Sequence, residues 1–566
     1  MLGIQQQKSL AKVISVGLFL VSVTVVTAGL TDPVNVPKLL LLGVLAMGIL
    51  GMLGSFNPKL FTYGNLQTKI ALGTFLLFSG ISIATSNSPL TQNIYGAYGR
   101  NNGFLAYLYL SILFFAATLI NSRSNQLIIL KSLVYVGFVN LAYCLWVIAF
   151  GDFIPWNNPY GNILGTFGNP NFIGAFFGIF FGVLLALGSG SDATKNFRIS
   201  LIFLLPLTLF AIIDSQAIQG RVLAVLSVGI VGVFLVYFRY SRMITLLFIL
   251  FCTTLGSLAL AGAFQKGPLA EIIYKTSVSL RGQYWLAAWN TGQANPFSGV
   301  GMDAFGDWYR RSRDDRAIEL PGIDTVVNTA HNVPLDMFAF GGWPLFVSYV
   351  AIMVIAFLAL IRIVHRMKSY DAVGVGLITA WTCYQVQSII SINQIGLAIW
   401  GWVLSGCLIA YSRVLPENDA RPKESSVPGK RQQSRKPEAK PTSVLFASVF
   451  GLVGLLVSLP PVSADTKLRT AQVSRDAVKL EETMKYSYFN PQNSQKYLLN
   501  IQAFECSGLF EISHKYALEA VSWNPEAYEL WRILYFVKNS TDSERKLAVE
   551  NMRRLDPLNP DVTSIR

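Results

Sequence analysis

Long apolar runs recur from the N-terminal region to residue 461 and constrain the fold of this chain more than any other feature. One run reads LLLLGVLAMGILGMLG (39–54) and another reads VLAVLSVGIVGVFLVYF (222–238). Such runs approach the roughly 20 apolar residues with which a helix crosses a bilayer. They also lack the polar stripe of a helix on the surface of a soluble protein. With 52% hydrophobic and 13% charged residues, an ordinary soluble globular fold is excluded.

These runs predict an all-α fold, a polytopic transmembrane helical bundle of about 13 spans with a long outer loop and a C-terminal helical extramembrane domain. The first run is long and others follow it, so it predicts a retained anchor rather than a cleaved signal peptide. The predicted spans are 11–30, 36–54, 69–86, 103–120, 127–150, 171–189, 198–214, 221–238, 243–263, 342–361, 372–390, 392–412 and 443–461.

Lysine and arginine alternate along the chain in a way that predicts its orientation. With Lys8 and Lys12 in the cytoplasm, every second loop is basic, as cytoplasmic loops are. This topology places the loop 264–341 and the tail 462–566 on the outer, periplasmic side. The net charge of +14 is then mostly a signal of membrane topology, and it gives no indication of nucleic-acid binding.

Composition divides the chain into four parts. Residues 1–412 form the membrane domain, and 413–442 form a basic linker on the cytoplasmic side, too polar to bury a core. An additional transmembrane helix at 443–461 leads to the outer helical tail at 462–566. The stretch WNPEAYELW and its neighbours resemble a tetratricopeptide hairpin, but only one or two units are visible. Both a docking module and a plain helical cap fit this tail.

Polar motifs gather in the predicted outer segments, and three of them contain an arginine that could hold a phosphate. Arg221 follows QAIQG and opens a span on the side where arginine is disfavoured, so it needs a partner. Guanidinium binds phosphate oxygens with two parallel hydrogen bonds. Arg281 precedes Trp285 by one helical turn, and Arg100 lies in the loop YGRNNG. The alternatives are a snorkelling anchor for Arg221, an aromatic belt around Arg281 and a plain turn at Arg100.

Other polar residues favour structural roles. Asn169 and Pro170 predict a helix cap and a first-turn proline, so a ligand role for Asn171 is the weaker reading. Arginines alternate with Asp314 and Asp315 in the run 310–316, which most simply predicts a solvated face of mixed charge.

His331 is the sharpest candidate for chemistry among the three histidines of the chain. It lies in NTAHNVPLD, where Asn328 and Asn332 could orient its ring. Neutral imidazole can take a proton from a hydroxyl near pH 7, although a lone histidine is more often structural. The five cysteines show no metal spacing, and neither an HExxH motif nor a CxxC motif occurs, so no metal site and no cofactor are predicted.

Taken together, YGRNNG, GTFGNPNFIGAF, QGR, RGQYWLAAW with NPFSGVGMDAF, and AHNVPLDMFAFGGWP resemble a known family. They are similar to the O-antigen ligase and O-antigen polymerase-like superfamily of membrane glycosyltransferases, which includes protein O-oligosaccharyltransferases. The resemblance covers most of residues 70–410.

This resemblance implies a multi-pass enzyme of the bacterial inner membrane that acts in polysaccharide or lipopolysaccharide biosynthesis. It would transfer a glycan from an undecaprenyl pyrophosphate carrier to an acceptor hydroxyl on the outer face, with inversion and without a metal. By motif position His331 would be the catalytic base, Arg221, Arg281 and Arg100 would hold the pyrophosphate, and the partners would be a lipid-linked donor and a lipid or protein acceptor. The outer tail could bind a protein partner.

Three alternatives stay open. A repeat-unit polymerase of the same superfamily would use the same site on a lipid-linked acceptor. A transporter of lipid-linked sugars would place charged residues deep in the spans, and a scaffold that presents the tail would not need His331 or Arg221. The sequence names neither the sugar nor the acceptor.

Overall fold

The computed structural model describes residues 2–56, 64–274, 276–414 and 441–564. Most of these residues are helical, and among them no strand forms apart from an isolated bridge between Ser487 and Asn490. The basic linker predicted at 413–442 lies almost wholly outside the described residues.

All of the predicted spans fall on helices, and the predicted all-α polytopic fold is confirmed. By length and apolar composition, nine helices of the described chain can cross a membrane, and α1, α5, α15 and α16 carry the other predicted spans. The helices concerned are α1 (Ile4–Val23), α2 (Asn35–Phe56), α3 (Leu66–Thr85), α5 (Phe104–Ala117), α6 (Arg123–Phe150), α7 (Pro170–Gly188), α8 (Lys195–Asp214), α9 (Ile218–Arg239), α10 (Arg242–Ala263), α14 (Val333–Arg366), α15 (Ala372–Ile389), α16 (Ile395–Tyr411) and α17 (Pro441–Ser474).

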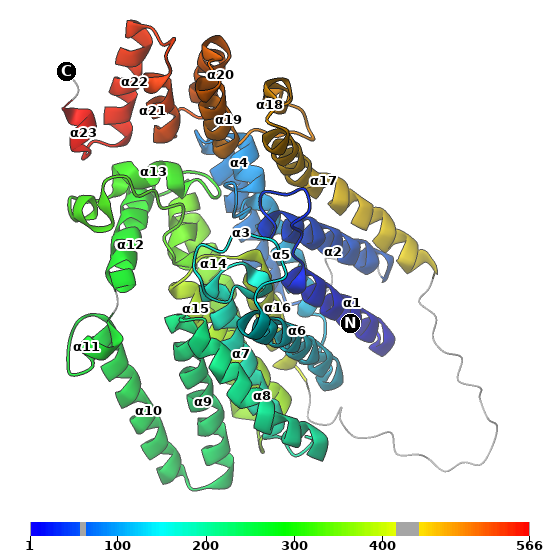
Figure 1. Ribbon diagram of the computed structural model, residues 1–566. Helices are drawn as coiled ribbons and strands as arrows, with labels where there is room; N and C mark the ends of the chain where they lie inside the picture. The colour runs from blue at the N-terminus through cyan, green and yellow to red at the C-terminus, as the bar shows by residue number, and fades with distance from the viewer. Residues whose placement is uncertain (1, 57–63, 275, 415–440, 565–566) are drawn as a thin grey trace.

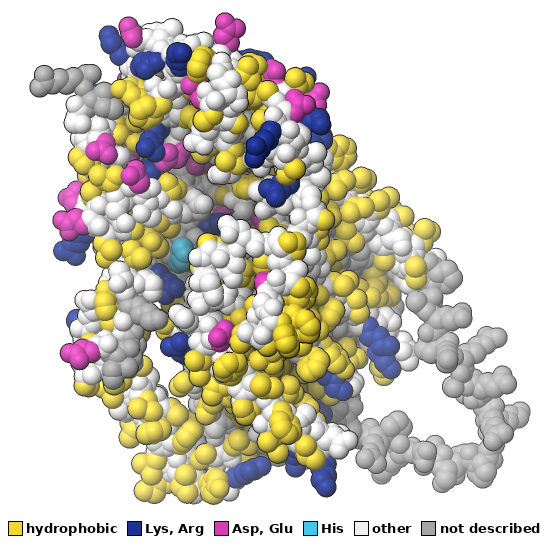
Figure 2. Space-filling model, in the orientation of Figure 1, with side chains coloured by type: hydrophobic (Ala, Val, Ile, Leu, Met, Phe, Trp, Pro, Cys, Tyr) yellow, Lys and Arg dark blue, Asp and Glu magenta, His cyan; other side chains and the backbone are white. Residues whose placement is uncertain are grey.

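The long helices run side by side, and the short helices of the C-terminal tail gather at one end of the bundle (Figure 1). Hydrophobic side chains dominate the surface of the bundle, whereas acidic side chains concentrate at the end that carries the tail (Figure 2). Lysine and arginine also gather at the opposite end (Figure 2). The tail helices are α18 (Ala477–Met484), α19 (Ser494–Cys506), α20 (Phe510–Trp523), α21 (Tyr528–Phe536), α22 (Asp542–Leu555) and α23 (Pro560–Thr563).

α17 packs lengthwise against α2 because both helices present glycine at their crossing. A Cβ atom on Gly43 would lie 3.1 Å from the Gly454 carbonyl oxygen. Small residues at such a crossing let two helix backbones approach within a membrane. α17 then continues without interruption to Ser474, through the boundary predicted at 461/462, so the additional span and the base of the tail are one helix.

The outer loop is hydrogen-bonded to α14 beside a break in that helix. Gly341 and Gly342 leave the helical conformation, and Gly342 has a φ of 64°, which glycine adopts without strain. The Val300 and Gly301 amides donate to the carbonyls of Ala339 and Phe340 at 3.0 Å, just before this break. The outer loop also contains α11 (Ala270–Ile273), α12 (Thr276–Ala294), α13 (Phe305–Ser312) and the turn η3 (Ile318–Gly322).

Candidate active site

The loop that carries His331 is held by a buried carboxylate on the first turn of α14. Asp336 is 2% exposed and accepts hydrogen bonds from the Thr329 hydroxyl at 2.6 Å and from the Ala330 amide at 2.8 Å. The Thr329 oxygen in turn accepts a 3.3 Å bond from the His331 amide. Asn332 caps α14 by accepting from the Leu335 amide at 3.0 Å. The histidine therefore has a fixed backbone, held in the left-handed region with a φ of 54°.

The ring of His331 has one nitrogen engaged and one free for chemistry. Nδ1 lies 3.3 Å from the Thr329 carbonyl oxygen, which can only accept a hydrogen bond. This contact favours the tautomer with the proton on Nδ1, and it leaves the lone pair of Nε2 as the acceptor. Tyr284 of α12 packs against the ring with centroids 5.4 Å apart. The sequence predicted that the side-chain amides of Asn328 and Asn332 could orient the ring. In the structure the contact to Nδ1 comes from the Thr329 carbonyl, and the side chain of Asn332 is the helix cap described above.

His331 stays neutral at physiological pH. Burial is the largest cause that lowers its pKa, to about 4, and the positive charges of Arg281 and Arg100 lower it further. The contact with Thr329 opposes this change. The structure thus brings His331, Arg281 and Arg100 into one electrostatic environment although they are far apart in sequence. The two positive charges keep the imidazole neutral, and they would stabilise an anion bound beside them.

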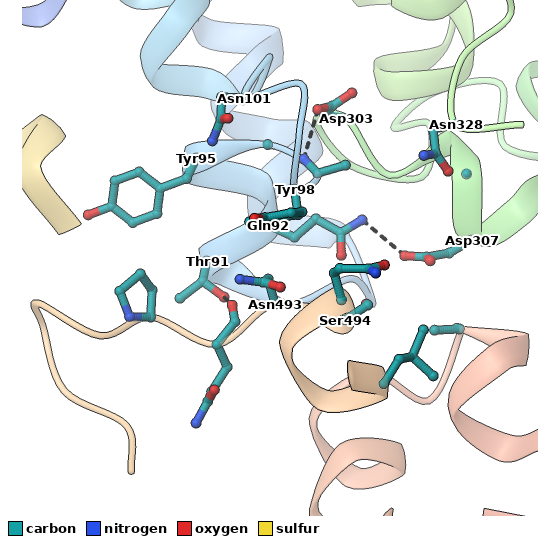
Figure 3. A pocket seen from close by; sticks show the side chains of 18 of the residues that line it. Thr91, Gln92, Tyr95, Tyr98, Asn101, Asp303, Asp307, Asn328, Asn493 and Ser494 are labelled. Carbon is teal, nitrogen blue, oxygen red and sulfur yellow. Dashed lines mark hydrogen bonds between the residues drawn. The ribbon is translucent and has the colours of Figure 1, made fainter. Parts of the chain in front are cut away.

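Arg100 belongs to the loop between α4 (Leu90–Tyr95) and α5, and it pairs with Asp303 of the outer loop. Asp303 also accepts a 2.8 Å hydrogen bond from the Ala97 amide, shown as a dashed line in Figure 3. Burial raises the pKa of this carboxyl, and the Arg100 charge opposes the rise. Nε and Nη1 of Arg100 are buried and find no hydrogen-bond partner among the described residues.

Arg281 lies on α12 and is half-buried, and burial lowers its pKa, which the nearby Tyr284 opposes. Within the described chain, no carboxylate forms an ion pair with it. Arg221 begins the exposed face of α9, where its guanidinium donates a 3.3 Å hydrogen bond to the Ile213 carbonyl. The backbone amide of Asn171 donates a hydrogen bond to the side-chain oxygen of Asn169, which caps α7 as predicted. The structure gives neither Arg221 nor Asn171 a contact with the cluster around His331.

The arginine run 310–316 is a solvated face, as its alternating charges predicted, only at Asp315 and Arg316. Arg310 and Arg313 are 3% and 4% exposed, and both bind Asp556 of the tail, at 3.0 and 2.8 Å. Arg310 also pairs with Glu529 at 2.7 Å, and its guanidinium lies 4.4 Å from the Tyr528 ring centroid. The prediction was wrong for Arg310 and Arg313 because the carboxylates that bury them come from a distant part of the chain. The tail is therefore docked on the outer loop.

A cavity of about 320 Å³ lies where the tail, α4 and the outer loop meet (Figure 3). Gln92 of α4 donates a 3.0 Å hydrogen bond to Asp307 at its wall, and Asn524 of the tail donates to the same carboxylate at 3.1 Å. Asn328 lines the cavity three residues before His331. Burial raises the pKa of Asp307, and the bonds from Asn524 and Gln92 oppose the rise. The tail is thus part of the wall behind the candidate active site.

Sequence reasoning missed the residues that hold the candidate base and the first arginine. Asp303 in GVGMDAF, Asp336 in NVPLD and Thr329 in NTAHN stand inside motifs that the sequence singled out. The signal of the two aspartates was a carboxylate in a run otherwise apolar, whereas Thr329 carried no such signal. A buried carboxylate needs partners, but the sequence cannot say which ones.

The fold and this site define a multi-pass membrane protein with a basic, histidine-containing site at one end of its helical bundle. Residues 175–350 match a protein family described as O-antigen ligase. This match confirms the predicted resemblance, and it makes the segment similar to the O-antigen ligase-like superfamily of membrane glycosyltransferases, of the ligase or polymerase type. It contains Arg221, Arg281 and His331, whereas Arg100 precedes it. No curated protein matches the chain.

Proposed function

We propose that this protein transfers a glycan from a polyprenyl pyrophosphate carrier, such as undecaprenyl pyrophosphate, to an acceptor hydroxyl on the outer face of the membrane. The observation that carries the proposal is the neutral ring of His331 in the field of Arg281 and Arg100. The family match supports a lipid-linked donor and a membrane setting.

In this reaction Nε2 of His331 removes the proton of the acceptor hydroxyl while the oxygen attacks the anomeric carbon of the donor sugar. The bond from that carbon to the pyrophosphate oxygen breaks, and its electron pair leaves with the carrier. Direct displacement of this kind inverts the anomeric carbon. Arg281 and Arg100 stabilise the negative charge that grows on the leaving pyrophosphate, a task that a divalent metal performs in other sugar transferases. Arg221, at the exposed start of α9, would contact the carrier at the membrane surface.

Binding of the donor would also prepare the base. In the structure two arginine charges lower the pKa of His331, and a weakly basic imidazole is a poor proton acceptor. The pyrophosphate offsets these charges and raises the pKa toward the range in which histidine is an effective base. The proton is then taken only when the leaving group is in place.

The test compares cells that contain wild-type protein, His331→Ala, Arg281→Ala or no protein, with protein amount checked by immunoblot. We expect both variants to lose surface glycoconjugate and to accumulate lipid-linked glycan. His365→Ala is the matched control because this exposed histidine lies at the far end of α14, and it should behave as wild type. Normal glycoconjugate in the His331 and Arg281 variants would contradict the proposal and favour a transporter or a scaffold.

The same experiment separates a ligase from a polymerase. Loss of a ligase leaves long glycans on the carrier, because chain growth precedes transfer. Loss of a polymerase leaves single repeat units, since these are its substrates. The length of the accumulated lipid-linked glycan, read by gel electrophoresis and mass spectrometry, decides between the two.

A further inference from the structure

A second cavity, of about 560 Å³, is lined by Arg100 and shares no lining residue with the cavity of Figure 3. This volume is within the range of small-molecule sites. Four loops that join the outer ends of helices surround it, together with Arg469 of α17. The loops comprise residues 27–35, 99–102, 155–169 and 392–394.

Four residues that line this cavity carry buried polar side-chain atoms that have no partner among the described residues. They are both side-chain atoms of Asn393, Oδ1 of Asn102, Oδ2 of Asp32, and Nε and Nη1 of Arg100. Asn102 and Asn393 are only 3% and 4% exposed. Buried polar groups are normally hydrogen-bonded, so a concentration of such atoms around one cavity indicates a polar occupant.

The chemistry of these atoms selects the occupant. Three are oxygen acceptors and three are nitrogen donors. A phosphate offers mainly acceptors and would be opposed by the carboxylate of Asp32 and the carbonyl oxygens of the two amides. A hydroxyl donates and accepts at once, so it suits both the acceptors and the donors of the set. Trp156 lines the same cavity, and its half-buried ring offers an apolar surface.

We propose that this cavity is a subsite for a neutral, hydroxyl-rich sugar ring of the substrate. Arg100 lines the cavity and also acts on the charge of His331, so the sugar next to the pyrophosphate of the donor is the ring that reaches it most directly. The assignment rests on the proposed transfer reaction, and it places glycan recognition on residues outside the family-matched segment. A sugar of the acceptor would present the same chemistry.

Asn393→Leu is the decisive variant because it replaces the amide by an apolar side chain of similar volume. The Asn393 side chain forms no hydrogen bond within the described chain, and its backbone carbonyl, which accepts from Asn102, is unchanged. The empty protein should therefore fold as well as wild type, and its thermal midpoint in detergent should not fall. Asn196→Leu, at an exposed asparagine of α8, is the matched control.

Binding is measured with the purified full chain in nanodiscs. The probes are undecaprenyl pyrophosphate and lipid-linked glycan extracted from cells that carry the His331→Ala variant. We expect Asn393→Leu to weaken binding of the lipid-linked glycan about tenfold and to leave binding of undecaprenyl pyrophosphate unchanged. The Arg281→Ala variant should weaken both, since it removes a proposed pyrophosphate contact.

A second arm measures transfer in membranes at varied acceptor concentration. If Asn393→Leu leaves both probes unaffected but raises the apparent KM for acceptor, the cavity binds a sugar of the acceptor. Unchanged binding together with unchanged KM would overturn the subsite, as would equal weakening of both probes. Failure of the wild type to bind lipid-linked glycan would instead contradict the proposed function.

Discussion

The Thr329 hydroxyl donates a 2.6 Å hydrogen bond to the buried carboxylate of Asp336, and this contact links the loop of the candidate base to α14. The same hydroxyl oxygen accepts from the His331 amide, and the Thr329 carbonyl meets Nδ1 of the ring. One threonine thus positions both the backbone and the imidazole of His331.

Thr329→Val should lower kcat for transfer about 10- to 100-fold and leave the apparent KM for lipid-linked donor unchanged. Valine keeps the shape but cannot donate to Asp336, and an unsatisfied buried acceptor costs about 1–3 kcal/mol. Thr329→Ser retains the hydroxyl and is the matched control. Initial rates in membranes at varied donor concentration check the split between kcat and KM. Equal rates for the valine and serine variants would show that the hydroxyl does not position the base.

The pH dependence of transfer should report the lowered pKa of His331. A base acts in its neutral form, so the rate falls as pH drops through that pKa. In the free protein the pKa is about 4, and the acid limb of kcat/KM should lie near it, well below the ordinary value of histidine. The limb of kcat should lie at higher pH, because the bound pyrophosphate offsets the arginine charges.

Arg281→Gln provides the control for this assignment. Arg281 is one of the causes that lower the pKa of His331, so its removal should shift the acid limb of kcat/KM upward even though the rate itself falls. An acid limb that does not move in this variant would show that the titrating group is not His331.

Features that depend on neighbouring residues were predicted correctly from the sequence, whereas features that depend on contacts between distant residues were not. Membrane helices follow from local apolar composition, and the start of α7 follows from Asn169 and Pro170, so these were predicted correctly. The pairing of Arg310 and Arg313 with Asp556 spans more than 240 residues and reversed the prediction of a solvated face for these two arginines. The environment shared by His331 and Arg100 depends on the whole bundle, and no local pattern encodes it.

Asp556→Asn should destabilise the outer region of the protein by about 3–5 kcal/mol, because it leaves two buried arginines short of their counter-charge. The effect should appear as a lower thermal midpoint and as faster proteolysis within the tail and the outer loop. Asp561→Asn, at an exposed position on α23, is the matched control. Replacing Arg310, Arg313 and Asp556 together by apolar residues of similar size should recover much of the stability. A normal thermal midpoint for Asp556→Asn would show that the ion pairs do not hold the tail.

Arg221 lies on the exposed start of α9 and bonds only the Ile213 carbonyl among the contacts of the described residues. If Arg221 contacts the pyrophosphate of an arriving donor at the membrane surface, before the donor reaches His331, its planar guanidinium matters more than its charge, since only arginine binds phosphate through two parallel hydrogen bonds. Arg221→Lys should therefore raise the apparent KM for lipid-linked donor about tenfold, while kcat stays close to wild type because the base is untouched.

Arg239→Lys is the matched control, because Arg239 lies in the last turn of the same helix. Rates at varied donor concentration should show wild-type values for this variant. A lower kcat with unchanged KM in Arg221→Lys would instead place the guanidinium at the reacting pyrophosphate, which would require α9 to move toward His331 when donor binds. Wild-type kinetics in both variants would leave Arg221 as an anchor of the helix end.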